Sequence, residues 1–172
     1  MNANLYISAN YGLLNNRRGL ESMKKMLLVL IGLIPFVLGF VMNSWLMDNP
    51  DSILPFKLIG ILFLGFWVLV GFLTYKYDIK PYPSSLIIHL PALVVLFLIM
   101  YQDMVLEQFW PNLIGLATQF YYLTLINISS SISSFMMTGG YVQMYPLCIV
   151  AFLLMYGSYY VGCFLKKVLS SK

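Results

Sequence analysis

The chain has 172 residues, of which 60% are hydrophobic and only 9% are charged, and its formal net charge is +4. An average soluble domain has about 25% charged residues, so a water-soluble domain of this size would lack the charges needed to cover its surface. Intrinsic disorder is excluded more firmly, because it requires low hydrophobicity and high charge. The composition predicts an all-α, polytopic integral membrane protein.

The first 22 residues differ from the rest of the chain. Residues 1–22 are polar, rich in asparagine and without hydrophobic periodicity. We interpret them as a disordered tail or as a translated leader, because Arg17 and Arg18 can be encoded by AGG AGG, a bacterial ribosome-binding sequence. In the second case the native start is Met23 rather than the first methionine. In both cases residues 23–172 are expected to form a single helical membrane domain.

Four apolar runs are the candidates for membrane spans, each without a charge in its middle. A span needs about 20 apolar residues. The first run is longer than a signal-peptide core, and no small-x-small cleavage site follows it, so we expect an uncleaved span. The predicted spans cover residues 26–47, 53–75, 86–101 and 146–165.

The lysines alternate with the acidic residues from one loop to the next. Cytoplasmic loops retain lysine and arginine, and this bias sets the orientation of a membrane protein. The pattern predicts that both termini are cytoplasmic and that the number of crossings is even. Lysines lie before the first span, between the second and third, and after the last: Lys24, Lys25, Lys76, Lys80, Lys166, Lys167 and Lys172. The other loops carry Asp48, Asp51, Asp103 and Glu107, with Lys57 as the exception.

The segment 109–134 is the ambiguous part of the chain. It is long enough to span, but polar residues recur along it at helical spacing, at Asn112, Gly115, Gln119, Tyr122 and Ser129. We therefore expect an amphipathic or re-entrant helix that does not cross, beside four full crossings. The alternative is a fifth transmembrane helix, which would place the C-terminal lysines outside the cytoplasm, against the positive-inside rule.

Four polar residues are the candidate contacts for a ligand or a partner protein. His89 is the only histidine, and an intramembrane histidine can relay protons, bind a ligand, or simply hydrogen-bond a carbonyl. Asn43 lies on the first span, and Gln119 and Asn127 lie in the segment 109–134. A polar cavity between Asn43, His89 and Gln119 would favour transport, whereas a close-packed apolar core would favour a role in helix contacts.

Two prolines are expected to bend their helices. Pro35 and Pro91 each lie inside a predicted span, where proline removes a backbone hydrogen bond and permits a kink. Small residues share a face with Pro35 on the first span, and the second span has a similar face with Gly60 and Gly71. These faces are typical of close helix packing, with a ligand path beside Asn43 as the alternative.

The sequence carries no recognisable catalytic chemistry. It lacks nucleophile-elbow, zinc-protease, phosphate-loop and dinucleotide motifs. No cluster of Cys, Asp or Glu accompanies His89, so neither a metal nor another cofactor is predicted. Asp103 and Glu107 are interpreted as exposed solubilising charges. The positive net charge is explained by lysines that face anionic lipid, so no nucleic-acid partner is expected.

Two classes of function remain. The first is a small bacterial cell-membrane protein without enzymatic activity, acting as an accessory, immunity or complex-forming subunit. Its partners would be the lipid bilayer and other membrane subunits or further copies of itself. The second is a transporter or a substrate-binding membrane component with a polar cavity near residues 109–134. An intramembrane enzyme is disfavoured, because no nucleophile is paired with a base.

Overall fold

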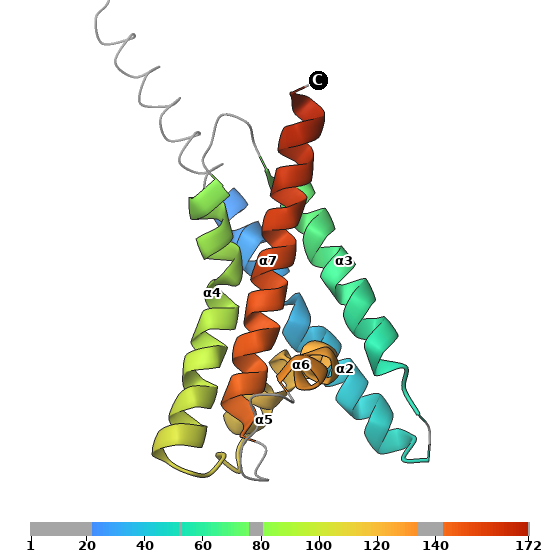
Figure 1. The fold of residues 1–172 in the computed structure, drawn as a ribbon. Helices are drawn as coiled ribbons and strands as arrows, with labels where there is room; N and C mark the ends of the chain where they lie inside the picture. The colour runs from blue at the N-terminus through green and yellow to red at the C-terminus, as the bar shows by residue number, and fades with distance from the viewer. Residues whose placement is uncertain (1–21, 52, 76–80, 134–142, 172) are drawn as a thin grey trace, which may run out of the picture.

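The computed structural model describes residues 22–51, 53–75, 81–133 and 143–171. Every regular element in these ranges is helical (Figure 1). Four helices are long and apolar enough to cross a membrane, and shorter helices accompany them. The predicted class, a helical membrane protein with four spans and a further membrane-associated segment, is confirmed. Nearly all of the predicted tail or leader lies outside the described residues.

The four candidate spans are Ser22–Asp48, Phe56–Thr74, Ser84–Val105 and Met144–Ser170. Their helices are α2 (Ile34–Asp48), α3 (Phe56–Thr74), α4 (Pro81–Met100) with its π-helical extension η1 (Tyr101–Val105), and α7 (Met144–Ser170). Three spans are longer than the apolar runs, because the helices continue into polar residues. The second is shorter, because Pro55 occupies the N-cap of α3 and restricts Leu54 to non-helical backbone.

The first span is interrupted close to Pro35. A turn at Leu33 separates the helical residues before it from α2. In a regular helix the amide of Phe36 would bond to the Gly32 carbonyl, but it bonds to Leu33 instead, at 3.1 Å. The Gly32 carbonyl is therefore released from the helix ladder. Pro91, by contrast, lies within α4, which continues as a helix on both sides of it.

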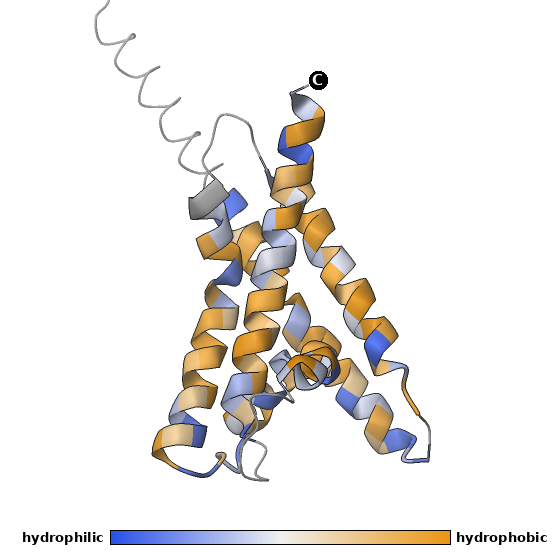
Figure 2. Ribbon diagram, in the orientation of Figure 1, coloured by the Kyte–Doolittle hydropathy of each residue, from blue (hydrophilic) through white to orange (hydrophobic). Residues whose placement is uncertain are grey.

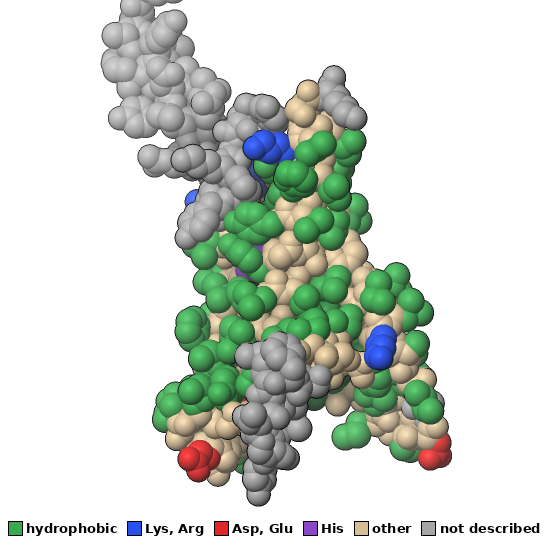
Figure 3. Space-filling model, in the orientation of Figure 1, with side chains coloured by type: hydrophobic (Ala, Val, Ile, Leu, Met, Phe, Trp, Pro, Cys, Tyr) green, Lys and Arg blue, Asp and Glu red, His purple; other side chains and the backbone are tan. Residues whose placement is uncertain are grey.

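The four spans alternate in direction, so the helix that begins at Ser22 and the C-terminal end of α7 lie at the same end of the bundle (Figure 1). Lysines mark this end, which we call the basic end: Lys24, Lys25, Lys166 and Lys167. Acidic residues mark the opposite, acidic end: Asp48, Asp51, Asp103 and Glu107. Figure 3 shows this separation of the charged side chains. Lys57, the second residue of α3, is the exception, because it lies near the acidic end.

The segment 109–134 forms two short helices, α5 (Leu113–Tyr121) and α6 (Leu123–Ser133), where one was predicted. Figure 1 shows both in the half of the bundle nearer the acidic end, with α6 seen end-on across the long helices. At about 1.5 Å per residue, neither helix can cross a hydrocarbon core about 30 Å thick. The chain breaks at Tyr122, where two adjacent tyrosine side chains are anchored on different helices.

Hydrophobic residues occur along the long helices on all sides, as the hydropathy colouring of the ribbon shows (Figure 2). Phe97, Leu62 and Leu153 are 66%, 65% and 58% exposed, although each lies well inside a span. Such an exterior is stable in contact with lipid, where apolar surface is not penalised. The structure thus defines a membrane-embedded protein.

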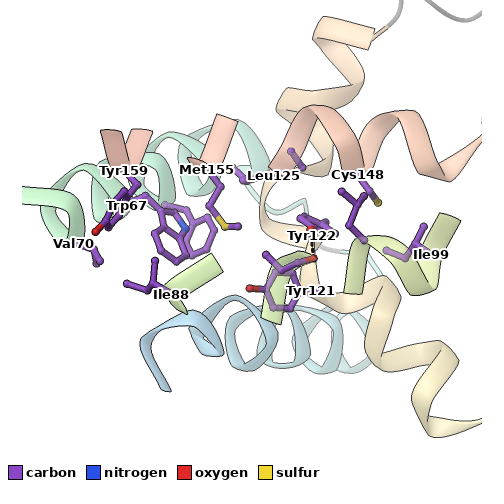
Figure 4. Packing of buried hydrophobic residues seen from close by; sticks show 14 of the residues in the cluster. Trp67, Val70, Ile88, Ile99, Tyr121, Tyr122, Leu125, Cys148, Met155 and Tyr159 are labelled. Carbon is purple, nitrogen blue, oxygen red and sulfur yellow. Dashed lines mark hydrogen bonds between the residues drawn. The ribbon is translucent and has the colours of Figure 1, made fainter. Parts of the chain in front are cut away.

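The interior is built from α3, α4, α7 and the two short helices, around Trp67 and Tyr122 (Figure 4). Glycines set the closest approaches. A β-carbon on Gly71 would overlap the Tyr159 carbonyl, and one on Gly162 would overlap the Val68 carbonyl, so α3 and α7 pack backbone to backbone. Gly32 and Gly39 likewise approach the Ile88 and Phe120 carbonyls, so the predicted small-residue face of the first span packs against helices.

Candidate functional site

His89 is buried near the basic end, between α3, α4 and α7. Its Nδ1 lies 2.9 Å from the carbonyl oxygen of Ser85, one helical turn earlier. Because a carbonyl can only accept, Nδ1 donates, and in the neutral ring Nε2 is then an acceptor. This Nε2 meets no hydrogen-bond partner within the described part of the chain.

Four aromatic rings from two other helices surround the imidazole. Trp67 of α3 lies nearest, with its ring centroid 4.9 Å from that of His89 and an interplanar angle of 32°. From α7, Tyr156 and Tyr159 lie at 5.2 Å and Phe152 at 6.3 Å, all edge to face. Figure 4 shows Trp67, Tyr159 and Ile88 near one another in the interior, and in Figure 3 the histidine is almost wholly hidden.

Three buried polar atoms around His89 have no described hydrogen-bond partner: Trp67 Nε1, Ser85 Oγ and His89 Nε2. All three side chains are at most 1% exposed. Buried polar groups are nearly always paired, so a group of three unpaired ones requires an explanation. We call Ser85, His89 and Trp67 the unpaired cluster.

The hydroxyls on the flank of the unpaired cluster are engaged elsewhere. Tyr159 and Thr74 share a hydrogen bond of 3.0 Å, and the Thr74 hydroxyl donates to the Val70 carbonyl. Tyr156 donates to Tyr160 at 3.3 Å. The Tyr160 hydroxyl faces the Ser85 side chain without reaching hydrogen-bond geometry. The half-buried tyrosines of α7 therefore form the rim of the cluster.

A second polar centre, which sequence reasoning missed, surrounds Gln102 in η1. Its side chain is fully buried, and its Nε2 donates to the Leu98 carbonyl at 3.2 Å and to Thr118 Oγ1 of α5 at 3.4 Å. Its Oε1 accepts from the Trp110 amide at 3.0 Å. The backbone carbonyl of Gln102 also accepts from the Gln108 amide. One side chain thus holds the turn that leads from the third span into α5.

Asp103 caps the N-terminus of α7, so its interpretation as an exposed solubilising charge was wrong. Its Oδ2 accepts from the backbone amides of Met144 and Tyr145, at 2.8 and 2.9 Å. The first amides of a helix have no intrahelical partner, and an anion there is favoured by the helix dipole. The N-cap residue Gln143 forms no side-chain cap. Hydropathy carries no signal for a contact across 41 residues of sequence.

The adjacent tyrosines explain why the segment 109–134 is broken. Tyr121 donates to the Gly32 carbonyl at 2.6 Å, the group that the turn at Leu33 releases. Tyr122 donates to the Ala92 carbonyl of α4 at 2.7 Å. These bonds tie α5 and α6 to two different spans.

The predicted site residues do not form a single site. Asn43, Gln119 and Asn127 lie on α2, α5 and α6, which pack against one another, whereas His89 contacts α3 and α7. All three amides are half-buried, and their side chains form no hydrogen bond with any residue that the structure describes. We call them the amide set. The structure therefore does not bring His89 together with the amide set.

The described residues contain no group of three His, Cys, Asp or Glu side chains that could hold a metal ion. Comparison of the chain with protein-family models, with curated proteins and with solved structures finds no match. The unpaired cluster and the amide set are therefore the two candidate functional sites.

Proposed function

We propose that this is a bacterial cell-membrane protein without enzymatic activity, acting as an accessory, immunity or complex-forming subunit. It would bind another membrane subunit, or a second copy of itself, through the amide set. One observation supports this: each amide of the set exposes part of a polar side chain that no described residue hydrogen-bonds. Exposed amides are costly in lipid, and interhelical hydrogen bonds from a partner remove that cost.

These three side chains lie well inside the bundle, where an amide exposed to lipid is unfavourable. Asn43 lies five residues before the end of α2, so it is about 8 Å inside that helix end. Asn127 lies beside Ile128, whose side chain contacts Gly60, in the second turn of α3. Gln119 precedes Phe120, whose backbone touches Gly39. All three positions lie further into the bundle than the acidic residues of the acidic end.

The charge distribution supports an orientation with both termini in the cytoplasm. Four described lysines lie at the basic end, and the described acidic residues lie at the other. The positive-inside rule places the basic end in the cytoplasm. A phosphatase reporter fused after Lys172 should then be inactive and a fluorescent reporter at the same place active. The reverse result would contradict this orientation.

The decisive experiment removes all three amides together. We expect the protein extracted from its native membrane to migrate as a complex, and the variant Asn43→Leu/Gln119→Leu/Asn127→Leu to migrate as a monomer with equal or higher thermal stability. Thr118→Val is the matched control, because it removes an internal hydrogen bond and should lower stability without dissociating the complex. An unchanged complex in the triple variant would contradict the proposal. A fall of about 0.6–2 kcal/mol per amide would mean that the amides bond within the chain instead.

A transporter or substrate-binding component is the second candidate. The observation in its favour is the unpaired cluster, since buried polar atoms without partners are typical of a ligand site. Four spans are few for a solitary carrier, so this function also requires oligomerisation or a partner subunit.

A further inference from the structure

We propose that the unpaired cluster binds the hydroxyl group of a small neutral molecule, either water or an organic hydroxyl compound. The inference is independent of the amide set, which lies on other helices. It starts from three atoms, Trp67 Nε1, Ser85 Oγ and His89 Nε2, all buried and all without a described partner.

The donor and acceptor properties of these atoms restrict which hydrogen-bonding groups the ligand can have. Trp67 Nε1 can only donate, and His89 Nε2 can only accept while Nδ1 donates to the Ser85 carbonyl. A ligand that satisfies both must accept one hydrogen bond and donate another. Ser85 Oγ can do either, so it adds no constraint. A hydroxyl group or a water molecule meets these demands, whereas a carbonyl or ether leaves His89 unpaired.

Charged ligands fit the surroundings less well. The four rings around His89 come from Trp67, Phe152, Tyr156 and Tyr159, and none of them carries a charge. The nearest lysine on α7, Lys166, points its Nζ at the Phe72 ring, 5.5 Å from the centroid. A metal ion is also disfavoured, because the described residues contain no group of three His, Cys, Asp or Glu side chains that could hold one. Flat aromatic walls instead suit water or a small planar hydroxyl compound.

The unpaired cluster lies close to the basic end of the bundle. Ser85 and His89 lie in the first two turns of the third span, counted from the basic end. The rim tyrosines, Tyr156 and Tyr160, are half-buried and joined by their hydroxyls. A ligand that enters from the basic end therefore need not cross the apolar middle of the bundle.

Because the chain has one histidine, isotope labelling of histidine reports on this site alone. We would label histidine with ¹⁵N and ¹³C in the full chain, reconstitute it in lipid nanodiscs, and record solid-state NMR spectra in water and with added phenol. We expect Nδ1 protonated, Nε2 unprotonated with the shift of a hydrogen-bond acceptor, and magnetisation transfer to the imidazole from a hydroxyl source. Transfer from water that phenol does not alter identifies water, and displacement by phenol identifies an organic hydroxyl site.

Two variants and a control make the test specific. Trp67→Phe and Ser85→Ala each remove one hydrogen-bonding group, and each should reduce the transfer severalfold. Phe152→Leu changes a ring that touches His89 but removes no polar atom, so the transfer should persist. Should Trp67→Phe perturb folding, Ser85→Ala decides, because it deletes only an unpaired oxygen. A wild-type imidazole without contact to water or phenol would overturn the proposal, as would a charged imidazole whose signal follows the anion present.

Discussion

The surroundings of Gln102 and the unpaired cluster around His89 are both fully buried and polar, yet their hydrogen bonding differs. Near the acidic end, both ends of the Gln102 amide are bonded, to Leu98, Thr118 and Trp110. Near the basic end, three atoms of the unpaired cluster remain without described partners. The hydrogen bonds of Gln102 stabilise the turn between the third span and α5. The unpaired cluster instead has donors and an acceptor that remain available to a ligand. In a low-dielectric interior, this difference determines how much a mutation lowers the unfolding free energy.

Gln102→Leu should have the largest effect on stability, because it removes the side chain that makes the hydrogen bonds of the fully bonded region. The Trp110 amide and the Thr118 hydroxyl would lose their bonds to this side chain, so we expect the unfolding free energy in detergent to fall by about 2–4 kcal/mol. Gln108→Leu, at an exposed side chain nearby, should change little. A loss no larger in Gln102→Leu than in the control would contradict the structural role of this side chain.

Gly71→Ala should have the next largest effect, because it separates two walls of the unpaired cluster. The added β-carbon would collide with the Tyr159 carbonyl, a backbone atom that cannot rotate away. Such overpacking costs about 1–3 kcal/mol. Gly157→Ala on α7 is the control, since open space surrounds that position. The prediction fails if thermal denaturation shows the same stability for both variants.

Asp103→Ala should lower stability by about 1–2 kcal/mol, which is typical of a lost helix N-cap. Asp103→Asn retains an acceptor for the Met144 and Tyr145 amides and should lose less. Hydrogen exchange at the first turn of α7 should accelerate in the alanine variant. Unchanged exchange there would show that the cap is not needed.

Ser85→Ala should have the smallest effect on stability, and a small loss would support the difference in hydrogen bonding between Ser85 and Gln102. Its Oγ has no described partner, so removing it leaves no other buried group newly unpaired. We expect a stability within about 0.5 kcal/mol of the wild type, measured in detergent without added phenol. A large loss would mean that the hydroxyl is bonded to another group of the chain and that the two regions do not differ as described.

Much of the fold could be predicted from hydropathy. The four spans were found within a few residues of their ends, and the polar recurrence in residues 109–134 correctly indicated a segment unlike the others. The break at Tyr122 was missed, because a recurrence of polar residues does not show which carbonyl each side chain will reach. Of the candidate residues, His89 was singled out, but its partners in space, Trp67 and the tyrosines of α7, were not.

The sequence by itself determined the membrane class and the four long apolar spans, because both depend on sums over neighbouring residues. The tertiary structure decided against a fifth span, since residues 109–134 form two short helices. Only the tertiary structure decided which polar atoms are paired. Tyr121 and Gly32 are 89 residues apart, and Asp103 and Met144 are 41 apart, so their bonds exist only after the spans have packed. The same packing buried Trp67 Nε1 and His89 Nε2 without described partners, which no local pattern indicates. In lipid, where water does not satisfy such groups, long-range pairing separates the bonded region from the unpaired one.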